Sequence, residues 1–360
     1  MGFLQTVSAL SSVSGSSLTA AYYGLFGQDP KRWNPEKVRE LLRTNFEAKW
    51  IFRWFLPHNI VRYWFTDFDR SDIMKAVFDD VLFEGKTLGE MPTGGPKILI
   101  NATRLSDGQR FVFTDEAFRA MGSRLDTYPV SHAVMASGAF PGAFHDVTLQ
   151  DYKEGAYEHL FDGGPVDNLG VETLLSVVGA LYAQLPAGRQ LACFFFLVDA
   201  YPRAREKAEQ SRQERDTRKA FDFILDDNLA DASDILLSRR RSDLLERVGF
   251  PEALVGQEAY REFAVIPGQP NGPRCSAWHL TFERLYALDE DRVGNIVNQI
   301  KTRYQLTGPA GYSAQQLQDS LYKAGRLLIR KDLASLRQAC QWFRDRGFSG
   351  VCLREFAVGQ

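Results

Sequence analysis

Alternating stretches of apolar and polar residues predict strands and helices that follow one another from the N-terminus. An apolar, strand-like stretch over Phe3–Val13 is interrupted at Gly15–Ser17, and helix-forming residues resume at Leu18–Tyr23. Two β-rich runs, Lys97–Leu105 and Arg110–Thr114, flank a Ser-Asp-Gly turn, and Asp-Gly between such runs is typical of a hairpin. The chain is therefore expected to open with strand, turn and helix, and to continue with a hairpin.

Further along, the pattern predicts one deeply buried strand and many helices. The run Leu191–Val198 is apolar throughout, as expected of a parallel strand that is buried on both faces. Prolines within 252–275 indicate a loop. Helices are predicted over 35–64 with a break at Pro57, over 70–83 with Ser71 as N-cap, and over 129–136, 171–185, 203–247 and most of 289–347. Strands alternating with helices predict one α/β domain with a mostly parallel central sheet, helices on both faces and a helical C-terminal elaboration.

The composition excludes two classes of protein. Among 360 residues, Lys and Arg total 43 against 45 for Asp and Glu, a net charge of −2. A nucleic-acid binder would need a surplus of cations, so no nucleic-acid partner is expected. No run of 18 apolar residues predicts a transmembrane helix, and the N-terminus lacks the basic region of a signal peptide. We therefore expect a cytoplasmic or peripheral membrane protein.

The cysteines and acidic residues show no pattern of a metal or cofactor site. Cys193, Cys275, Cys340 and Cys352 lack CxxC spacing, which predicts neither a zinc site nor a disulfide framework and favours a reducing compartment. Asp and Glu residues show no metal-ligand spacing, and the glycine-rich pieces are not followed by Lys-Ser/Thr. No cofactor is expected.

The most distinctive motif is Ser-Val-Ser-Gly-Ser at residues 12–16, between the predicted strand and helix. A nucleophile elbow has the form G-x-S-x-G, because small neighbours allow a tight turn that lifts the serine clear of the backbone. Here Ser12 and Ser16 replace the outer glycines but remain small. A helix N-terminus at Ser14 would favour a developing alkoxide. The alternative interpretation is a Ser/Gly-rich helix cap.

A second motif, Phe-Asp-Gly-Gly-Pro-Val-Asp-Asn-Leu, occupies residues 161–169. It follows an apolar strand end, and the two glycines allow the carboxylate of Asp162 to approach another backbone segment closely. The alternative interpretation is an ordinary turn or loop.

Together these features resemble the patatin-like phospholipase family. SSVSGSSLTAAYYG at 11–24 is close to the family form SGVSGGSLTAA, and MASGAFPGAF at 135–144 is close to ASSAIPGVF. LFDGGPVDNLGVETL at 160–174 is similar to the family's Asp-Gly-Gly or Asp-Gly-Ala followed by an Asn. KILINATRLSDGQRFVFT at 97–114 looks like the family's central hairpin. The motifs occur in the family's order, and the similarity extends over roughly residues 5–200.

The resemblance implies a lipid acyl hydrolase with a three-layer α/β/α core over residues 1–200, and a helical C-terminal part of the same domain over 201–360. It implies cleavage of carboxylic ester bonds in a phospholipid, lysophospholipid or related lipid ester, through an acyl-enzyme and without a cofactor. Ser14 would be the nucleophile and Asp162 the general base of a Ser-Asp dyad.

The resemblance also implies supporting roles for the neighbours of the dyad. Gly15 would donate a backbone N–H to the oxyanion hole, and Ser12 and Ser16 would complete the elbow. The loop that carries the aspartate would be supported by Gly163, Gly164 and Asn168.

One family feature is missing from these residues. Family members carry a glycine-rich loop, close to G-G-G-x-R-G, before the elbow, where it supplies oxyanion donors; the thirteen residues before Ser14 contain no such run. A first alternative is therefore a catalytically impaired or truncated member that binds lipid or a partner. A second is a soluble esterase with a Ser-His-Asp triad, for which His279 alone has the required chain order.

Two charged segments allow contact with a membrane. The segment Phe46–Phe68 mixes Trp, Tyr and Phe with Lys49, Arg53 and Arg62, as membrane-interface segments do. The alternative is a helical cap packed on the core. The triple Arg239–Arg241 is interpreted as a solvated helical face, with attraction to anionic lipid as the alternative.

Overall fold

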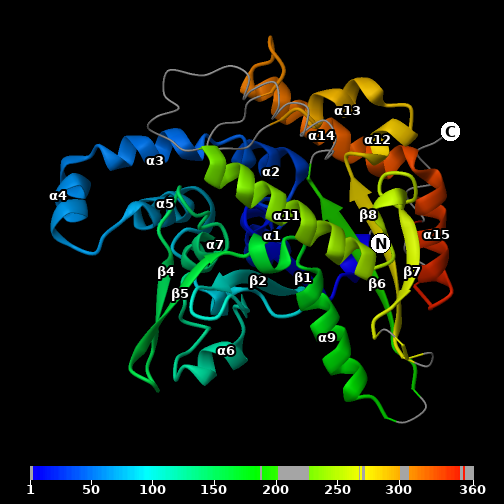
Figure 1. Cartoon of the computed structure of the whole chain (residues 1–360), viewed down its shortest axis with the longest axis horizontal. Coiled ribbons are helices and arrows are strands. Elements are labelled where there is room, and N and C mark those ends of the chain that lie inside the picture. Colours follow the sequence, from blue (N-terminus) through cyan, green and yellow to red (C-terminus); the bar gives the residue numbers. More distant parts are fainter. Residues whose placement is uncertain are drawn as a thin grey trace. The chain divides into compact units, whose positions relative to one another are not determined.

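The computed structural model describes residues 3–186, 189–201, 227–266, 268–269, 272–300, 308–348 and 352, with only the backbone of 227–234 (Figure 1). The chain divides into two compact units. We call residues 8–174 the N-terminal unit, and residues 1–7 with 175–360 the C-terminal unit. The boundary expected at residue 200 thus lies inside the C-terminal unit.

The N-terminal unit is built on a five-stranded sheet in the order β1-β2-β5-β4, with β3 also paired to β2. β1 and β2 are parallel, and β3, β5 and β4 join by antiparallel pairing. The expected hairpin over 97–114 is confirmed as β2 and β3. The strands are β1 (Ala9–Val13), β2 (Lys97–Arg104), β3 (Arg110–Val112), β4 (Val147–Asp151) and β5 (Ala156–Asp162).

Helices pack on this sheet and enclose a continuous apolar core that includes Ile100, Ala102 and Leu160 of the strands. The helix predicted over 70–83 begins after Asp69, not Ser71, because Asp69 forms a capping box with Asp72. The helical elements are α1 (Ser16–Phe26), α2 (Pro35–Leu42), α3 (Phe46–Trp54), α4 (Pro57–Phe65), α5 (Arg70–Phe78), the π-helical turn η2 (Asp79–Phe83), η3 (Leu88–Glu90), α6 (Asp115–Ala120), α7 (Val130–Ser137) and α8 (Gly164–Asp167); α9 (Val171–Ala183) leads into the C-terminal unit.

The C-terminal unit holds a second sheet in the order β6-β8-β7, with β6 and β8 parallel and β7 antiparallel to β8. Its elements are η1 (Phe3–Thr6), β6 (Ala192–Asp199), α11 (Asp227–Arg247), η4 (Glu252–Leu254), β7 (Tyr260–Ala264), β8 (Arg274–Thr281), α12 (Arg284–Ala287), α13 (Asp291–Val297), α14 (Ala314–Lys331) and α15 (Leu333–Arg344). The α/β class is confirmed. In each sheet one pair of strands is parallel, and the other strands are joined to it by antiparallel pairing.

Two predictions in this unit differ from the structure, and a third is confirmed in the part of it that the structure describes. The region 252–275 is not only a loop, because β7 and the start of β8 pair there. The strand β6 lies at the edge of its sheet and is not fully buried: Phe195 and Leu197 are buried on one face, Phe196 on the other face is half-buried against Phe343, and Val198 is 75% exposed. The helix predicted over 203–247 is present from Asp227 to Arg247, and residues 203–226 lie outside the described part of the chain.

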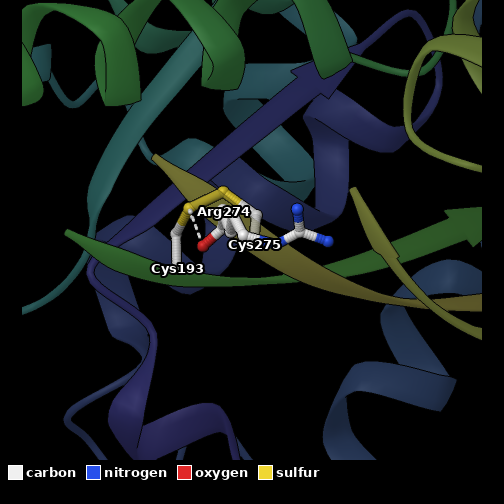
Figure 2. Close-up of a disulfide and its surroundings, with 3 residues drawn as sticks. All are labelled: Cys193, Arg274 and Cys275. Atoms are coloured by element: carbon white, nitrogen blue, oxygen red, sulfur yellow. Dashed lines mark hydrogen bonds between the residues drawn. A yellow bond between two sulfur atoms is a disulfide. The ribbon is translucent and has the colours of Figure 1, made fainter. Parts of the chain in front are cut away.

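The expectation of unpaired cysteines is wrong. Cys193 of β6 lies opposite Cys275 of β8 in the strand register, and the two form a disulfide with a Cα–Cα distance of 4.5 Å (Figure 2). Cys340 and Cys352 form a second disulfide, with a Cα–Cα distance of 5.9 Å. Sequence spacing missed the first pair because 82 residues separate partners that only the β6–β8 pairing brings together. Cysteine spacing therefore gives no argument for a reducing compartment.

Within the described ranges, no helix is long and apolar enough to cross a membrane. The same residues contain no group of three or more His, Cys, Asp or Glu side chains that could hold a metal ion.

Candidate active site

Ser14 occupies a tight turn between a strand and a helix. β1 ends at Val13, and α1 begins at Ser16 with Gly15 as its N-cap residue. The φ angle of Ser14 is +54°, in the left-handed region that residues with a side chain rarely adopt. The N–H of Ser17 donates to the Ser14 carbonyl at 2.9 Å and closes the turn. The predicted strand, turn and helix are confirmed, and the turn presents the Ser14 side chain at the helix N-terminus.

The predicted elbow residues Ser12 and Ser16 hold the turn together. The Ser16 hydroxyl donates to the Val13 carbonyl at 2.7 Å and accepts from the Val13 N–H at 2.9 Å. Ser12 is buried and accepts a hydrogen bond from the Ser17 hydroxyl at 3.1 Å. Gly15 is exposed, and a Cβ added there would meet no atom within 4 Å. The helix N-terminus is therefore open beside Ser14.

Asp162 lies directly against the serine. The Ser14 hydroxyl donates a 2.7 Å hydrogen bond to Oδ2 of Asp162, across 148 residues of sequence. Asp162 ends β5, opposite Ala102 of the neighbouring strand β2, and the Thr103 hydroxyl donates to its carbonyl at 2.8 Å. The N–H of Gly164 donates to Oδ1 at 2.8 Å. Both carboxylate oxygens thus accept a hydrogen bond, and Oδ2 faces the serine.

The two glycines after Asp162 each serve a different structural purpose. A Cβ at Gly163 would lie 2.5 Å from the carbonyl oxygen of Asn101, so only glycine allows β5 and β2 to approach this closely. Gly164 begins α8 and supplies the N–H that binds the carboxylate. Asn168 is the C-cap residue of α8, and its supporting role stays a prediction that rests on its place in the loop.

Burial raises the pKa of Asp162 above its ordinary value of 3.8, and the hydrogen bonds from Ser14 and Gly164 offset part of that rise. A carboxylate with a raised pKa is a stronger base than an exposed one. A half-buried hydroxyl that donates to a buried carboxylate is the arrangement required for removal of the serine proton.

Residues 2–175 match the family model described as patatin-like phospholipase. Residues 2–175 belong to the patatin-like phospholipase family. The matched span contains both Ser14 and Asp162. The patatin-like domain is thus of a lipid acyl hydrolase family, with carboxylic ester hydrolysis in lipid metabolism as its general activity. No curated protein matched the chain.

Two residues that the sequence did not single out hold the turn at Ser14 in place. The Ser137 hydroxyl, at the end of α7, accepts the Ser14 N–H at 2.9 Å and donates to the Asn101 carbonyl at 2.6 Å. The amide of Asn101 donates to the Ser12 carbonyl at 2.9 Å and accepts from the Thr173 hydroxyl. Both residues are fully buried. Their presence in the quoted family stretches was the only available signal.

His279 is part of a different cluster. It is fully buried in β8, where its Nε2 lies 3.0 Å from Oδ2 of Asp199. The Nε of Arg241 donates to the same oxygen at 2.7 Å. Since Ser14 donates directly to Asp162, no histidine lies between them, and the structure does not support the His279 triad.

We call Asp199, Arg241 and His279 the Asp199 cluster. This cluster corrects the interpretation of Arg239–Arg241 as a solvated helical face. Arg241 is only 5% exposed and pairs with Asp199, so it is not part of a solvated face. Burial would raise the pKa of Asp199, but hydrogen bonding and charge from His279 and Arg241 outweigh burial and lower it to about 2. This buried ion pair is a structural element of the C-terminal unit.

Proposed function

We propose that this protein hydrolyses carboxylic ester bonds of lipids through a Ser14–Asp162 dyad. The observation that carries the proposal is the 2.7 Å hydrogen bond from the Ser14 hydroxyl to the buried Asp162 carboxylate, in a domain of the patatin-like family. The substrate is a phospholipid, a lysophospholipid or a related lipid ester, and no cofactor takes part.

In the first half of the reaction, the Ser14 oxygen attacks the ester carbonyl while Asp162 accepts the hydroxyl proton. The negative charge that develops on the carbonyl oxygen is stabilised by backbone N–H groups at the N-terminus of α1, with that of Gly15 as the first donor. Asp162 then returns the proton to the leaving alcohol, and the acyl group remains on Ser14.

In the second half, Asp162 accepts a proton from water as the water oxygen attacks the acyl-enzyme. The proton passes to Ser14 as the fatty acid leaves, which restores the starting state. The turn supports both halves, because the Ser137 hydroxyl fixes the Ser14 N–H and Gly163 keeps β5 close to β2.

We place the protein at a membrane surface as a peripheral protein, since its proposed substrates are held in bilayers or micelles.

The test is hydrolysis of a soluble short-chain nitrophenyl ester, with covalent labelling of Ser14 by a fluorophosphonate probe read by mass spectrometry. Ser14→Ala should abolish both turnover and labelling. Asp162→Asn should reduce turnover by about 10³-fold or more, as loss of an essential acid–base group does. Ser106→Ala is the matched control, because it removes an exposed hydroxyl that contacts Glu158 and neither Ser14 nor Asp162, so labelling of Ser14 should persist.

Two outcomes would contradict the proposal. Full turnover by Ser14→Ala would show that another residue is the nucleophile. Absence of turnover and of labelling in the folded wild-type protein would favour the alternative of an impaired member that binds lipid without cleaving it.

A further inference from the structure

The helical hairpin formed by α3 and α4 carries four large aromatic side chains that are mostly exposed. The exposed fractions are 69% for Phe52, 72% for Phe55, 75% for Trp64 and 81% for Phe65. In Figure 1 the hairpin, in blue, forms the outer end of the N-terminal unit, away from β1 and β2. We call these four side chains the aromatic face.

The opposite side of the hairpin is anchored in the core. Phe46 and Trp50 of α3 pack against the apolar core of the N-terminal unit. The ring of Trp50 lies 5.5 Å from that of Phe144, and its N–H donates to the Arg70 carbonyl at 2.9 Å. Sequence alone allowed the whole segment to be a cap on the core; the structure shows that only its inner side is one. The four side chains of the aromatic face are not part of that apolar core.

The aromatic face is comparable in area with the largest apolar patches of soluble monomers, which are often functional. A fully buried aromatic side chain covers about 150–250 Å², so four that are roughly three-quarters exposed present on the order of 500 Å². Monomeric proteins rarely expose contiguous apolar patches above a few hundred Å², and larger patches mark contact with a protein or a membrane.

The charges of the hairpin favour a lipid surface. Residues 46–65 contain three basic side chains, Lys49, Arg53 and Arg62, against one acidic side chain, Glu47, although the whole chain has a net charge of −2. Lys49 and Arg62 are exposed, and Arg53 pairs with Asp80. Exposed aromatic rings beside cations are the composition of segments that bind the headgroup region of anionic bilayers.

A hollow beside the aromatic face also suits a lipid. It has a volume of about 440 Å³ and is lined mainly by apolar side chains that include Leu56, Phe68 and Ile73, with the exposed Arg62 among its polar residues. An acyl chain is thin and flexible enough to enter such a hollow, and a cation beside it complements a phosphate.

The hairpin is also connected to the segment that supports the nucleophile. Trp50 contacts Phe144, which lies seven residues after Ser137, and the Ser137 hydroxyl accepts the Ser14 N–H. The hairpin that carries the aromatic face thus contacts the chain segment that follows Ser137.

We propose that the aromatic face of the α3–α4 hairpin docks the protein onto an anionic phospholipid bilayer. The rings enter the headgroup region, and Lys49 and Arg62 contact lipid phosphates. The choice of a lipid surface over a protein partner rests in part on the proposed function, so the two are tested by separate measurements.

The test is flotation with vesicles of phosphatidylcholine alone, and of phosphatidylcholine mixed with phosphatidylglycerol. The wild-type chain should bind the mixed vesicles more strongly. Combined replacement of Phe52, Phe55, Trp64 and Phe65 by Ser should lower the partition coefficient at least about tenfold. The matched control is Tyr152→Ser with Tyr157→Ser, which removes two rings that are 63% and 61% exposed elsewhere on the same unit, and it should bind as wild type does.

Two further variants separate the forces involved. Lys49→Gln should weaken binding to the mixed vesicles and leave binding to phosphatidylcholine unchanged. Quenching of tryptophan fluorescence by brominated lipid should be reduced in Trp64→Phe, because Trp64 is 75% exposed and is the tryptophan of the aromatic face.

The proposal is overturned if the wild type binds neither kind of vesicle, or if the fourfold variant binds like the wild type. A wild-type dimer in sedimentation that the fourfold variant converts to a monomer, without vesicle binding, would instead make the face an interface between two copies. Ser14→Ala should bind vesicles normally, and the fourfold variant should retain hydrolysis of the soluble ester. Failure of docking and failure of the dyad are thus distinguished.

Discussion

Ser14 combines a reactive position with a strained backbone. Its φ of +54° is maintained by the turn hydrogen bonds of Ser16, Ser17 and Ser137, not by its own preference. Left-handed backbone at a non-glycine residue costs about 1–2 kcal/mol. Strain held by surrounding structure is typical of functional positions.

The strain at Ser14 can be measured with two inactive variants. Ser14→Gly should be more stable than Ser14→Ala by about 1 kcal/mol, because glycine adopts a positive φ without a steric cost. Both variants lose the hydroxyl and its hydrogen bond, so each is the control for the other. The measurement is the free energy of unfolding in urea; equal stability of the two variants would show that the φ of Ser14 is not strained in solution.

The raised pKa of Asp162 predicts the acidic limb of the pH profile. Asp162 must be ionised to accept the Ser14 proton, so kcat/KM should fall as pH decreases through its folded pKa, which lies above 3.8. Thr103→Val should leave this limb in place, because the Thr103 hydroxyl binds the Asp162 carbonyl and not the carboxylate. A limb at or below 3.8 in the wild type would contradict the role of burial.

At the scale of elements, the site is formed where β1, β2 and β5 lie side by side. The register sets Val13 beside Asn101 and Ala102 beside Asp162, so the ends of β1 and β5 meet across β2. The helix α1 then begins at the serine, and α7 contributes Ser137. The close approach of β5 to β2 is possible because residue 163 is glycine.

Two glycines of the site should respond differently to the same substitution. Gly163→Ala places a Cβ 2.5 Å from the Asn101 carbonyl and should cost about 2 kcal/mol of stability, with reduced hydrolysis as Asp162 shifts. Gly15→Ala meets no atom within 4 Å and has a helical φ of −55°, so stability should be retained or slightly raised. Thermal unfolding of both variants is the measurement, and similar losses would contradict the steric argument.

At the scale of the whole molecule, the proposed active site and the disulfides belong to different units of the chain. The dyad belongs to the N-terminal unit, whereas both disulfides and the Asp199 cluster belong to the C-terminal unit. The two disulfides close loops of different length, with sequence separations of 82 and 12.

Reduction of the disulfides should therefore destabilise the C-terminal unit and leave hydrolysis of a soluble ester largely unchanged. Chain entropy predicts that paired replacement of Cys193 and Cys275 by Ala costs about 4.5 kcal/mol, and that of Cys340 and Cys352 about 3 kcal/mol. Calorimetry and an ester assay, each with and without reductant, provide the measurement. Loss of activity in parallel with loss of the disulfides would show that the two units are coupled.

Much of the N-terminal unit can be predicted from its residues, because the signals are local. The β2–β3 hairpin depends on a turn between β-rich runs, and the elbow depends on small residues between a strand and a helix. The dyad pair of Ser14 and Asp162 required the family resemblance, since their 148-residue separation contains no physical signal of contact. The Asp69 cap was missed because Ser71 two residues later is an equally acceptable cap in composition.

Features that depend on long-range pairing could not be read from the chain. The disulfide between Cys193 and Cys275, the burial of Arg241 against Asp199, and the place of β6 at a sheet edge all follow from which strands and helices become neighbours. The same holds for the aromatic face: composition identifies the rings of α3 and α4, but burial of the inner side and exposure of the outer side depend on how the hairpin packs. Local patterns specify the elements, and tertiary packing sets which side chains of each element contact one another or solvent.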